Sequence, residues 1–213
     1  MFKNYIVNTF TNIIYKKTIV FSLTCHKSPE CVIDLIENII ICFRRFNIYI
    51  LISTTEPINN AIQSKINNKI VRITSIRDPN KNIWGNIELF NEHMNNVEYL
   101  IKNNITYDYF WFVSSNEMFI RDILPFYLEN VVIKKPKEYN YKYNTEEVNN
   151  YYNNLKENTD NNVWWYNNII QDDNLINIYI KEKIILDAGP HEGMVLGKEF
   201  IEEIYNFYIN KIR

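Results

Sequence analysis

The chain has 213 residues, 46% of them hydrophobic, and a formal net charge of −2 at pH 7. This length and apolar content suit a single domain with a full core, so we expect one domain over residues 1–213, either a whole protein or a module of a longer one. A charge near neutrality, without a block rich in Lys and Arg, argues against nucleic acid as a partner. Asn and Ile are unusually frequent, which we attribute to coding bias rather than to function.

Hydrophobic and cysteine patterns predict a soluble, cytoplasmic protein. No apolar run approaches the roughly 20 residues that span a membrane, and residues 1–17 lack the continuous apolar core of a signal peptide. Cys25, Cys31 and Cys42 are odd in number, and their spacing matches no metal-binding motif. We therefore expect buried structural thiols in a reducing compartment.

Strands and helices alternate along the first part of the chain. Apolar runs rich in β-branched and aromatic residues predict strands at residues 18–24, 47–53, 69–74 and 107–113. Helical spacing of apolar residues predicts helices at residues 29–40, 58–66, 84–101 and 121–130. Ser28 is a candidate N-cap for the first helix, with Pro29 at its first position. This alternation indicates an α/β fold with a mostly parallel, Rossmann-like sheet flanked by helices.

Residues 107–121 are the most informative stretch. Their first half is apolar on both faces, which is typical of a central strand, and it ends in the polar residues 114–117. Ligands bind at the carboxyl ends of strands in open α/β sheets, so we expect a site here and at the ends of strands 18–24 and 47–53. A polar turn that only ends the strand would explain the same residues.

The second half of the chain is less regular. Between residues 134 and 181 Tyr, Asn, Glu and Lys dominate, and a mobile loop, an acceptor-binding segment or biased surface filler would all fit. Three of the four glycines fall within residues 189–197, together with His191 and Glu192. In a chain so poor in Gly, this cluster indicates a loop that needs unusual backbone conformations or close approach. An amphipathic helix is expected after it.

Four segments, taken in order, resemble a known family. Residues 21–27 contain a first strand that ends in a His-bearing turn, and residues 84–96 contain a long helix opened by Trp. Residues 107–121 contain a strand followed by an acid and a basic residue, and residues 192–200 contain a glycine-bearing strand and helix. Together these segments resemble the core-2 and I-branching N-acetylglucosaminyltransferase family, with its viral and algal relatives of GT-A fold.

The resemblance covers residues 18–130 and 187–213 and implies a single GT-A-like domain with glycosyltransferase activity. The implied reaction moves a sugar from a nucleotide-sugar donor, UDP-linked in our expectation, to a glycan hydroxyl with inversion. Such a transfer needs a base for the acceptor hydroxyl, a positive group for the departing diphosphate, and a site that holds both substrates in line. The resembled family works without a metal ion, so we expect no obligatory cofactor.

Glu192 is the candidate catalytic base because it lies in a glycine-bounded loop. Asp187 in the same loop is a second catalytic candidate, and Asp172 and Asp173 are rivals for the base. His191 could orient Glu192. A carboxylate that only orders its loop would explain Glu192 as well.

The other candidates divide between a donor side and an acceptor side. The donor-side candidates are Thr24, His26, Ser53, Arg77, Trp84, Ser115, Asn116, Glu117 and Arg121. The acceptor-side candidates are His191, Trp164 and Trp165. Glu117 would bind a sugar hydroxyl, or share Mn²⁺ or Mg²⁺ with the diphosphate, since both ions favour oxygen ligands.

Two arginines could face the diphosphate. Arg77, before Asp78, could reach a phosphate, although a surface position is the commoner meaning of such an Arg. Arg121 is the better candidate because of its neighbours, but an ion pair with Asp122 or Glu117 would explain it too.

Three further residues have plain structural explanations. His26 could approach the nucleotide or only complete a turn. Trp84 could stack on a ring or anchor the core at the start of a helix. His93, within that helix, is expected to be structural.

A catalytically inactive module of the same fold, which binds a glycan or a protein partner, is the alternative function. Two departures from the family favour it: residues 53–55 replace the family's acid after the second strand, and the family's later segment with a catalytic Glu has no counterpart. A nucleotidyltransferase would show a Gly-rich loop after the first strand, which residues 25–29 lack. Composition and resemblance together indicate a large DNA virus, which would place the protein in the host cytoplasm.

Overall fold

The computed structural model describes residues 16–25, 28–78, 87–115, 117–134, 143–157, 170–183, 185 and 193–211. Its strands are β1 (Thr18–Thr24), β2 (Asn47–Thr55), β3 (Val71–Arg77), β4 (Tyr109–Ser114) and β5 (Val195–Gly197). They form one five-stranded sheet in the order β3-β2-β1-β4-β5. Of these strands, only β5 runs antiparallel to its neighbour.

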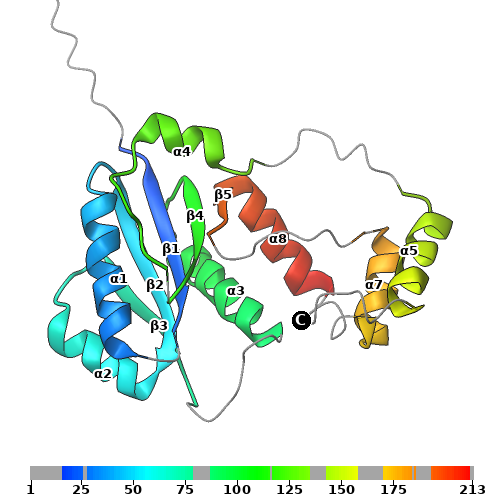
Figure 1. Cartoon of the computed structure of the whole chain (residues 1–213), viewed down its shortest axis with the longest axis horizontal. Coiled ribbons are helices and arrows are strands. Elements are labelled where there is room, and N and C mark those ends of the chain that lie inside the picture. Colours follow the sequence, from blue (N-terminus) through cyan, green and yellow to red (C-terminus); the bar gives the residue numbers. More distant parts are fainter. Residues whose placement is uncertain are drawn as a thin grey trace, which may run out of the picture.

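The helices are α1 (Pro29–Cys42), α2 (Glu56–Lys65), α3 (Ile87–Lys102), α4 (Pro125–Val131), α5 (Thr145–Glu157), α7 (Asp173–Glu182) and α8 (Lys198–Lys211). Figure 1 shows α1 and α2 against one face of the sheet and α3 and α8 against the other. The helices α5 and α7 pack on each other beside this body, around the small core of Val148, Tyr152, Ile170 and Ile176. The expected α/β fold, a mostly parallel sheet flanked by helices, is confirmed. None of the described helices is long and apolar enough to cross a membrane.

Several element ends differ from the expectation. β2 runs to Thr55, beyond the expected residue 53. α4 begins at Pro125, beyond the expected residue 121, and Ile123 N before it donates to Cys42 O at the end of α1 at 2.9 Å. The helices α5 and α7 lie where the sequence allowed no assignment. Ser28 precedes α1 but does not cap it, since its φ is 50° and its side chain makes no capping hydrogen bond.

Both faces of β1 are buried, which explains its unbroken apolar sequence. Phe21 faces the core under α1, whereas Val20 faces the core under α3 and α8, because side chains alternate along a strand. β4 alternates likewise, with Trp111 toward α1. In the last turn of α3 the buried side chain is that of Leu100, whereas Ile101 is 43% exposed.

Asn38 of α1 ties down the segment that follows β4. Its Nδ2 donates to Phe119 O at 3.0 Å, and its Oδ1 accepts from Phe119 N at 2.8 Å. The Phe119 ring then packs edge-on against Phe43 and Trp111, at 4.8 and 5.2 Å between ring centroids. One polar side chain therefore sets the path of the chain between the end of β4 and α4.

We expect Asn38→Ala to lower the free energy of unfolding by about 1–3 kcal/mol, since each lost hydrogen bond contributes about 0.5–1.5 kcal/mol. Urea unfolding measures this change. Asp34→Ala is the matched control, because Asp34 is exposed on the same helix and its replacement is expected to stay within about 0.5 kcal/mol. We call the two hydrogen bonds between Asn38 and Phe119 the Asn38 clamp. Equal unfolding midpoints for the two variants would show that the Asn38 clamp contributes nothing to stability.

Candidate functional site

Four hydroxyl residues form a row across the carboxyl ends of the parallel strands. Thr24 pairs in register with Ser53 on one side and with Ser114 on the other, and Ser53 pairs with Ser75. We call these four residues the hydroxyl row. The chain places β2 and β3 on one side of β1 and returns to the other side for β4, and such switch points open ligand-binding crevices. The strand ends that the sequence analysis grouped are therefore neighbours in the sheet.

A bulge in β3 orients the outer end of this row. The pairing of β2 with β3 passes from Ile52–Ile73 to Ser53–Ser75, which leaves Thr74 as an extra residue. Ser75 Oγ consequently lies 2.6 Å from Ser53 Oγ and donates to Glu92 Oε2 at 2.6 Å. Ser53 Oγ donates to the same carboxylate oxygen. The bulge thus lets two strands hold one carboxylate of α3.

Glu92 is a site residue that was not predicted from the sequence. It lies on the face of α3 that turns toward the sheet, together with His93 and Asn96, four residues further on. Asn96 Nδ2 donates to Ser22 Oγ at 2.7 Å, and the same oxygen lies 2.7 Å from His93 Nδ1. His93 is buried in this network, which confirms its structural role. The signal that could have revealed Glu92 is this polar group within an otherwise apolar face.

Arg77 ends β3 beside the hydroxyl row. Its Nη2 donates to Cys25 O at 2.6 Å, whereas Nη1 is buried and has no hydrogen-bond partner among the described residues. Burial lowers the pKa of the guanidinium, and the negative charge of Glu92 raises it. Arg77 is half-buried, so its guanidinium is less exposed than that of a typical surface Arg. An anion at this edge would pair with the open donor.

Burial raises the pKa of the Cys25 thiol to about 12, an effect that the positive charge of Arg77 opposes. The thiol therefore stays neutral at physiological pH, and Cys25 serves the site through its carbonyl oxygen. Cys42 is buried as expected, but Cys31 is exposed, so the prediction of buried thiols is wrong for that residue. Its position near the start of α1, on the outward face, explains the exposure.

Glu117 folds back onto the end of β4. Its backbone N donates to Ser114 O at 3.2 Å, and its Oε2 accepts from Ser114 N at 3.2 Å. Gly193 lies beside it, since a Cβ on Gly193 would stand 3.7 Å from Glu117 Oε1. Gly193 also has a φ of 76°, which favours glycine, and donates to Phe112 O at 2.9 Å. Glu117 thus lies between the hydroxyl row and the residue that follows Glu192 in the sequence.

Arg121 lies on a different surface from Arg77. The alternative explanation of Arg121 as the ion-pair partner of Asp122 is wrong, because among the described residues Asp122 pairs with Arg44 instead. The Arg121 guanidinium stands over the Tyr127 ring, 5.2 Å from the centroid.

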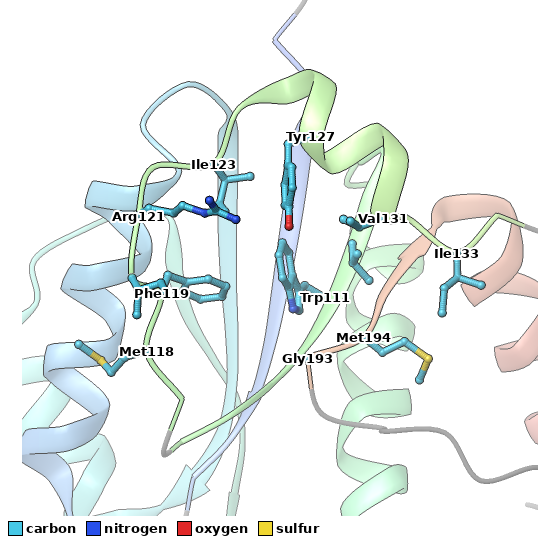
Figure 2. Close-up of a pocket in the computed structure, with 12 residues that line it drawn as sticks. Trp111, Met118, Phe119, Arg121, Ile123, Tyr127, Val131, Ile133, Gly193 and Met194 are labelled. Atoms are coloured by element: carbon cyan, nitrogen blue, oxygen red, sulfur yellow. The ribbon is translucent and has the colours of Figure 1, made fainter.

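Both side chains border a pocket of about 560 Å³. Its lining residues are Trp111, Met118, Phe119, Ile120, Arg121, Ile123, Tyr127, Val131, Ile133, Gly193, Met194 and Val195. Figure 2 shows Arg121, from the segment before α4, and Tyr127, from α4, pointing into this pocket toward Trp111.

The structure brings together the donor-side candidates Thr24, Ser53, Arg77 and Glu117, and Ser115 follows them in the turn after β4. The candidates His26, Trp84, Asn116, Trp164, Trp165, Asp187, His191 and Glu192 lie outside the described residues. Both rivals for the base have structural roles. Asp172 caps α7 by accepting from the backbone N of Asn174 and Leu175 at 3.1 Å, and Asp173 pairs with Lys156 at 2.9 Å.

Within the described ranges, no three His, Cys, Asp or Glu side chains gather into a group that could hold a metal ion. Glu117 alone does not make such a site there. No protein-family model matches this chain, and no curated protein matches its sequence significantly.

We expect iodoacetamide at pH 8 to modify Cys31 in the folded protein and to leave Cys25 and Cys42 intact. The two buried thiols have raised pKa values, so they stay protonated as well as inaccessible. Mass spectrometry of peptides measures the labelling, with denatured protein as the positive control. In Cys31→Ser, rapid labelling should disappear. Fast modification of native Cys25 would show that the end of β1 is open, against the structure.

Proposed function

We propose that the chain is a GT-A-type glycosyltransferase that uses a nucleotide-sugar donor, UDP-linked in our expectation. Arg77 carries the proposal, because its buried Nη1 has no partner within the described part of the chain. A diphosphate oxygen would accept a charge-assisted hydrogen bond from it. Thr54 Oγ1, near the end of β2, is a second buried polar atom without a described partner. Both atoms lie at the edge where ligands of open α/β sheets bind, which supports a polar, anionic ligand.

In the proposed reaction, the acceptor hydroxyl oxygen attacks the anomeric carbon of the donor sugar. The bond from that carbon to the diphosphate oxygen breaks, its electron pair leaves with the diphosphate, and the hydroxyl proton passes to a carboxylate base. Arg77 would offset the negative charge that develops on the leaving group. Glu92, held by Ser53 and Ser75, would keep the guanidinium charged and oriented. Attack opposite the leaving group inverts the anomeric centre.

Glu192 is the proposed base of this reaction. It lies outside the described residues, but its neighbour in sequence, Gly193, lies beside Glu117 at the end of β4. This contact supports a base close to the donor side. Because Asp172 caps α7 and Asp173 pairs with Lys156, we favour Glu192 and Asp187 over them as candidates for the base. We propose no obligatory metal ion, with Glu117 binding a donor hydroxyl.

A catalytically inactive module that binds a glycan or a protein partner is the second candidate function. Glu117 favours it, because its Oε2 already accepts a hydrogen bond from Ser114 N and so closes the end of β4. A carboxylate with this structural role need not touch a substrate. Binding and transfer measurements together distinguish the two functions.

The donor site is tested by thermal stability against UDP, GDP and CMP and their sugars, with Mn²⁺ or with EDTA. A ligand at about a hundred times its Kd stabilises the folded state by about 2.7 kcal/mol, which gives a clear shift in Tm. We expect one nucleotide class to shift the Tm in EDTA as well as in Mn²⁺. Arg77→Gln should weaken binding of that nucleotide about 10- to 100-fold, the loss of a hydrogen bond between charged groups.

Arg72→Gln is the matched control, because Arg72 lies on the same strand but is exposed, and its guanidinium donates to the carbonyl of its neighbour Val71. It should leave nucleotide binding unchanged. If both substitutions weaken nucleotide binding equally, the effect of Arg77→Gln comes from the loss of net charge and not from a specific contact. If no nucleotide or nucleotide sugar shifts the Tm of the unmodified chain, the transferase proposal is wrong and the binding module takes its place.

Glu192→Gln should abolish sugar transfer and leave donor binding intact, because the amide keeps the shape of the carboxylate but cannot take a proton. Glycan product formation measures transfer, and the thermal shift measures binding. Glu199→Gln, an exposed acid in the first turn of α8, is the control and should retain full activity. Turnover that survives in Glu192→Gln would remove this residue from the catalytic role.

A further inference from the structure

The pocket beside β4 is a partly open depression with a mostly apolar lining. Its volume of about 560 Å³ lies within the range of roughly 300–1,000 Å³ that is common for ligand pockets. Its floor and walls are apolar, with the Trp111 and Phe119 rings meeting edge to face at 5.2 Å between centroids. Such a lining would favour a ring or a short alkyl chain over a bare sugar.

Several apolar side chains around the mouth of this pocket are exposed to solvent. Met118 is 56% exposed, Ile120 95% and Tyr127 43%. A ligand that fills the pocket would remove part of this apolar surface from water, which is favourable by roughly 25 cal/mol per Å² buried.

Two polar groups in the pocket point to the chemistry of its occupant. Trp111 is 9% exposed, and its indole N–H is buried without a hydrogen-bond partner in the described part of the chain. Arg121 forms a cation–π contact with Tyr127 but no ion pair with any described residue. The buried indole donor without an acceptor favours a ligand that carries an oxygen acceptor. The exposed guanidinium of Arg121, which borders the same pocket, would pair with that oxygen if it is anionic. The expected occupant therefore joins an apolar body to a carboxylate or a phosphate.

The pocket also adjoins the proposed donor side. Gly193 lines the pocket and lies beside Glu117, which is bonded to the end of the hydroxyl row at Ser114. Met118, the next residue after Glu117, also lines the pocket and is labelled in Figure 2. A molecule seated in the pocket would thus extend toward the site where the donor sugar is expected.

We propose that this pocket binds the apolar aglycone of the acceptor, and that the acceptor is an amphipathic anion whose carboxylate or phosphate pairs with Arg121. This substrate class rests on the proposed function, since it names the acceptor of the transfer. The concave shape and the two unpaired donors favour a small molecule over a flat protein surface.

The probe is 4-phenylbutyrate, with 4-phenylbutan-1-ol as its uncharged counterpart, titrated into the full chain without nucleotide and followed by calorimetry. We expect saturable binding of the carboxylate that exceeds binding of the alcohol. Arg121→Gln should weaken the carboxylate about tenfold or more and leave the alcohol unchanged, since one charge-assisted contact is lost. Trp111→Phe, which keeps a ring but removes the N–H donor, should weaken the carboxylate too. Arg45→Gln, an exposed Arg outside the pocket, is the charge control.

Three outcomes would overturn the inference. One is no binding of the probe, and another is equal weakening by Arg121→Gln and Arg45→Gln. The third is concentration-dependent dimerisation that Ile120→Glu abolishes, which would assign the apolar surface to contact between copies of the chain. If the chain binds the probe but no nucleotide sugar, both the transfer reaction and the acceptor role of the pocket are refuted. If 4-carboxyphenyl glycosides react faster as acceptors than phenyl glycosides do, both proposals are supported.

Discussion

The structure depends on a central strand, β1, that is paired on both edges and buried on both faces. Parallel pairing with β2 and β4 fixes their registers against β1, so β1 and β4 end at the same level and β2 runs two residues beyond them, from Ser53 to Thr55. Burial on both faces requires helices above and below, and α1 and α3 supply them. The alignment of Thr24, Ser53 and Ser114 is a consequence of these registers. The proposed site is therefore a product of the same pairing that stabilises the fold.

Polar groups under α3 and polar groups at the candidate sites differ in how fully they are bonded. Ser22 and Asn96 are buried and hydrogen-bonded to each other, as buried polar groups in a stable core must be. Arg77 Nη1 and Trp111 Nε1 are buried without a partner among the described residues, at a cost of about 1–3 kcal/mol each. The Ser22–Asn96 network thus orients α3 without a ligand, whereas the donors of Arg77 and Trp111 would each gain a hydrogen bond from the proposed ligands.

The segment after β4 links the two surfaces. Glu117 stays at the strand end, the Asn38 clamp holds Phe119, and Arg121 then turns over Tyr127. The strand end and the pocket are therefore two sides of one short connection. If donor and acceptor bind as proposed, this connection determines their relative position.

The sequence by itself determined the α/β class, the order of strands and helices along residues 18–130, and the strand ends at which a site was expected. These features are local, because burial on both faces produces unbroken apolar strands and burial on one face produces helical spacing. The helices α5 and α7 escaped prediction because few of their residues are buried, and frequent Asn and Tyr hide the period. Only the tertiary structure decided the register that forms the hydroxyl row, the bulge that turns Ser75 toward Glu92, the half-burial of Arg77 and the pocket over Trp111. Each of these depends on contacts between residues far apart in the chain, which no local pattern encodes.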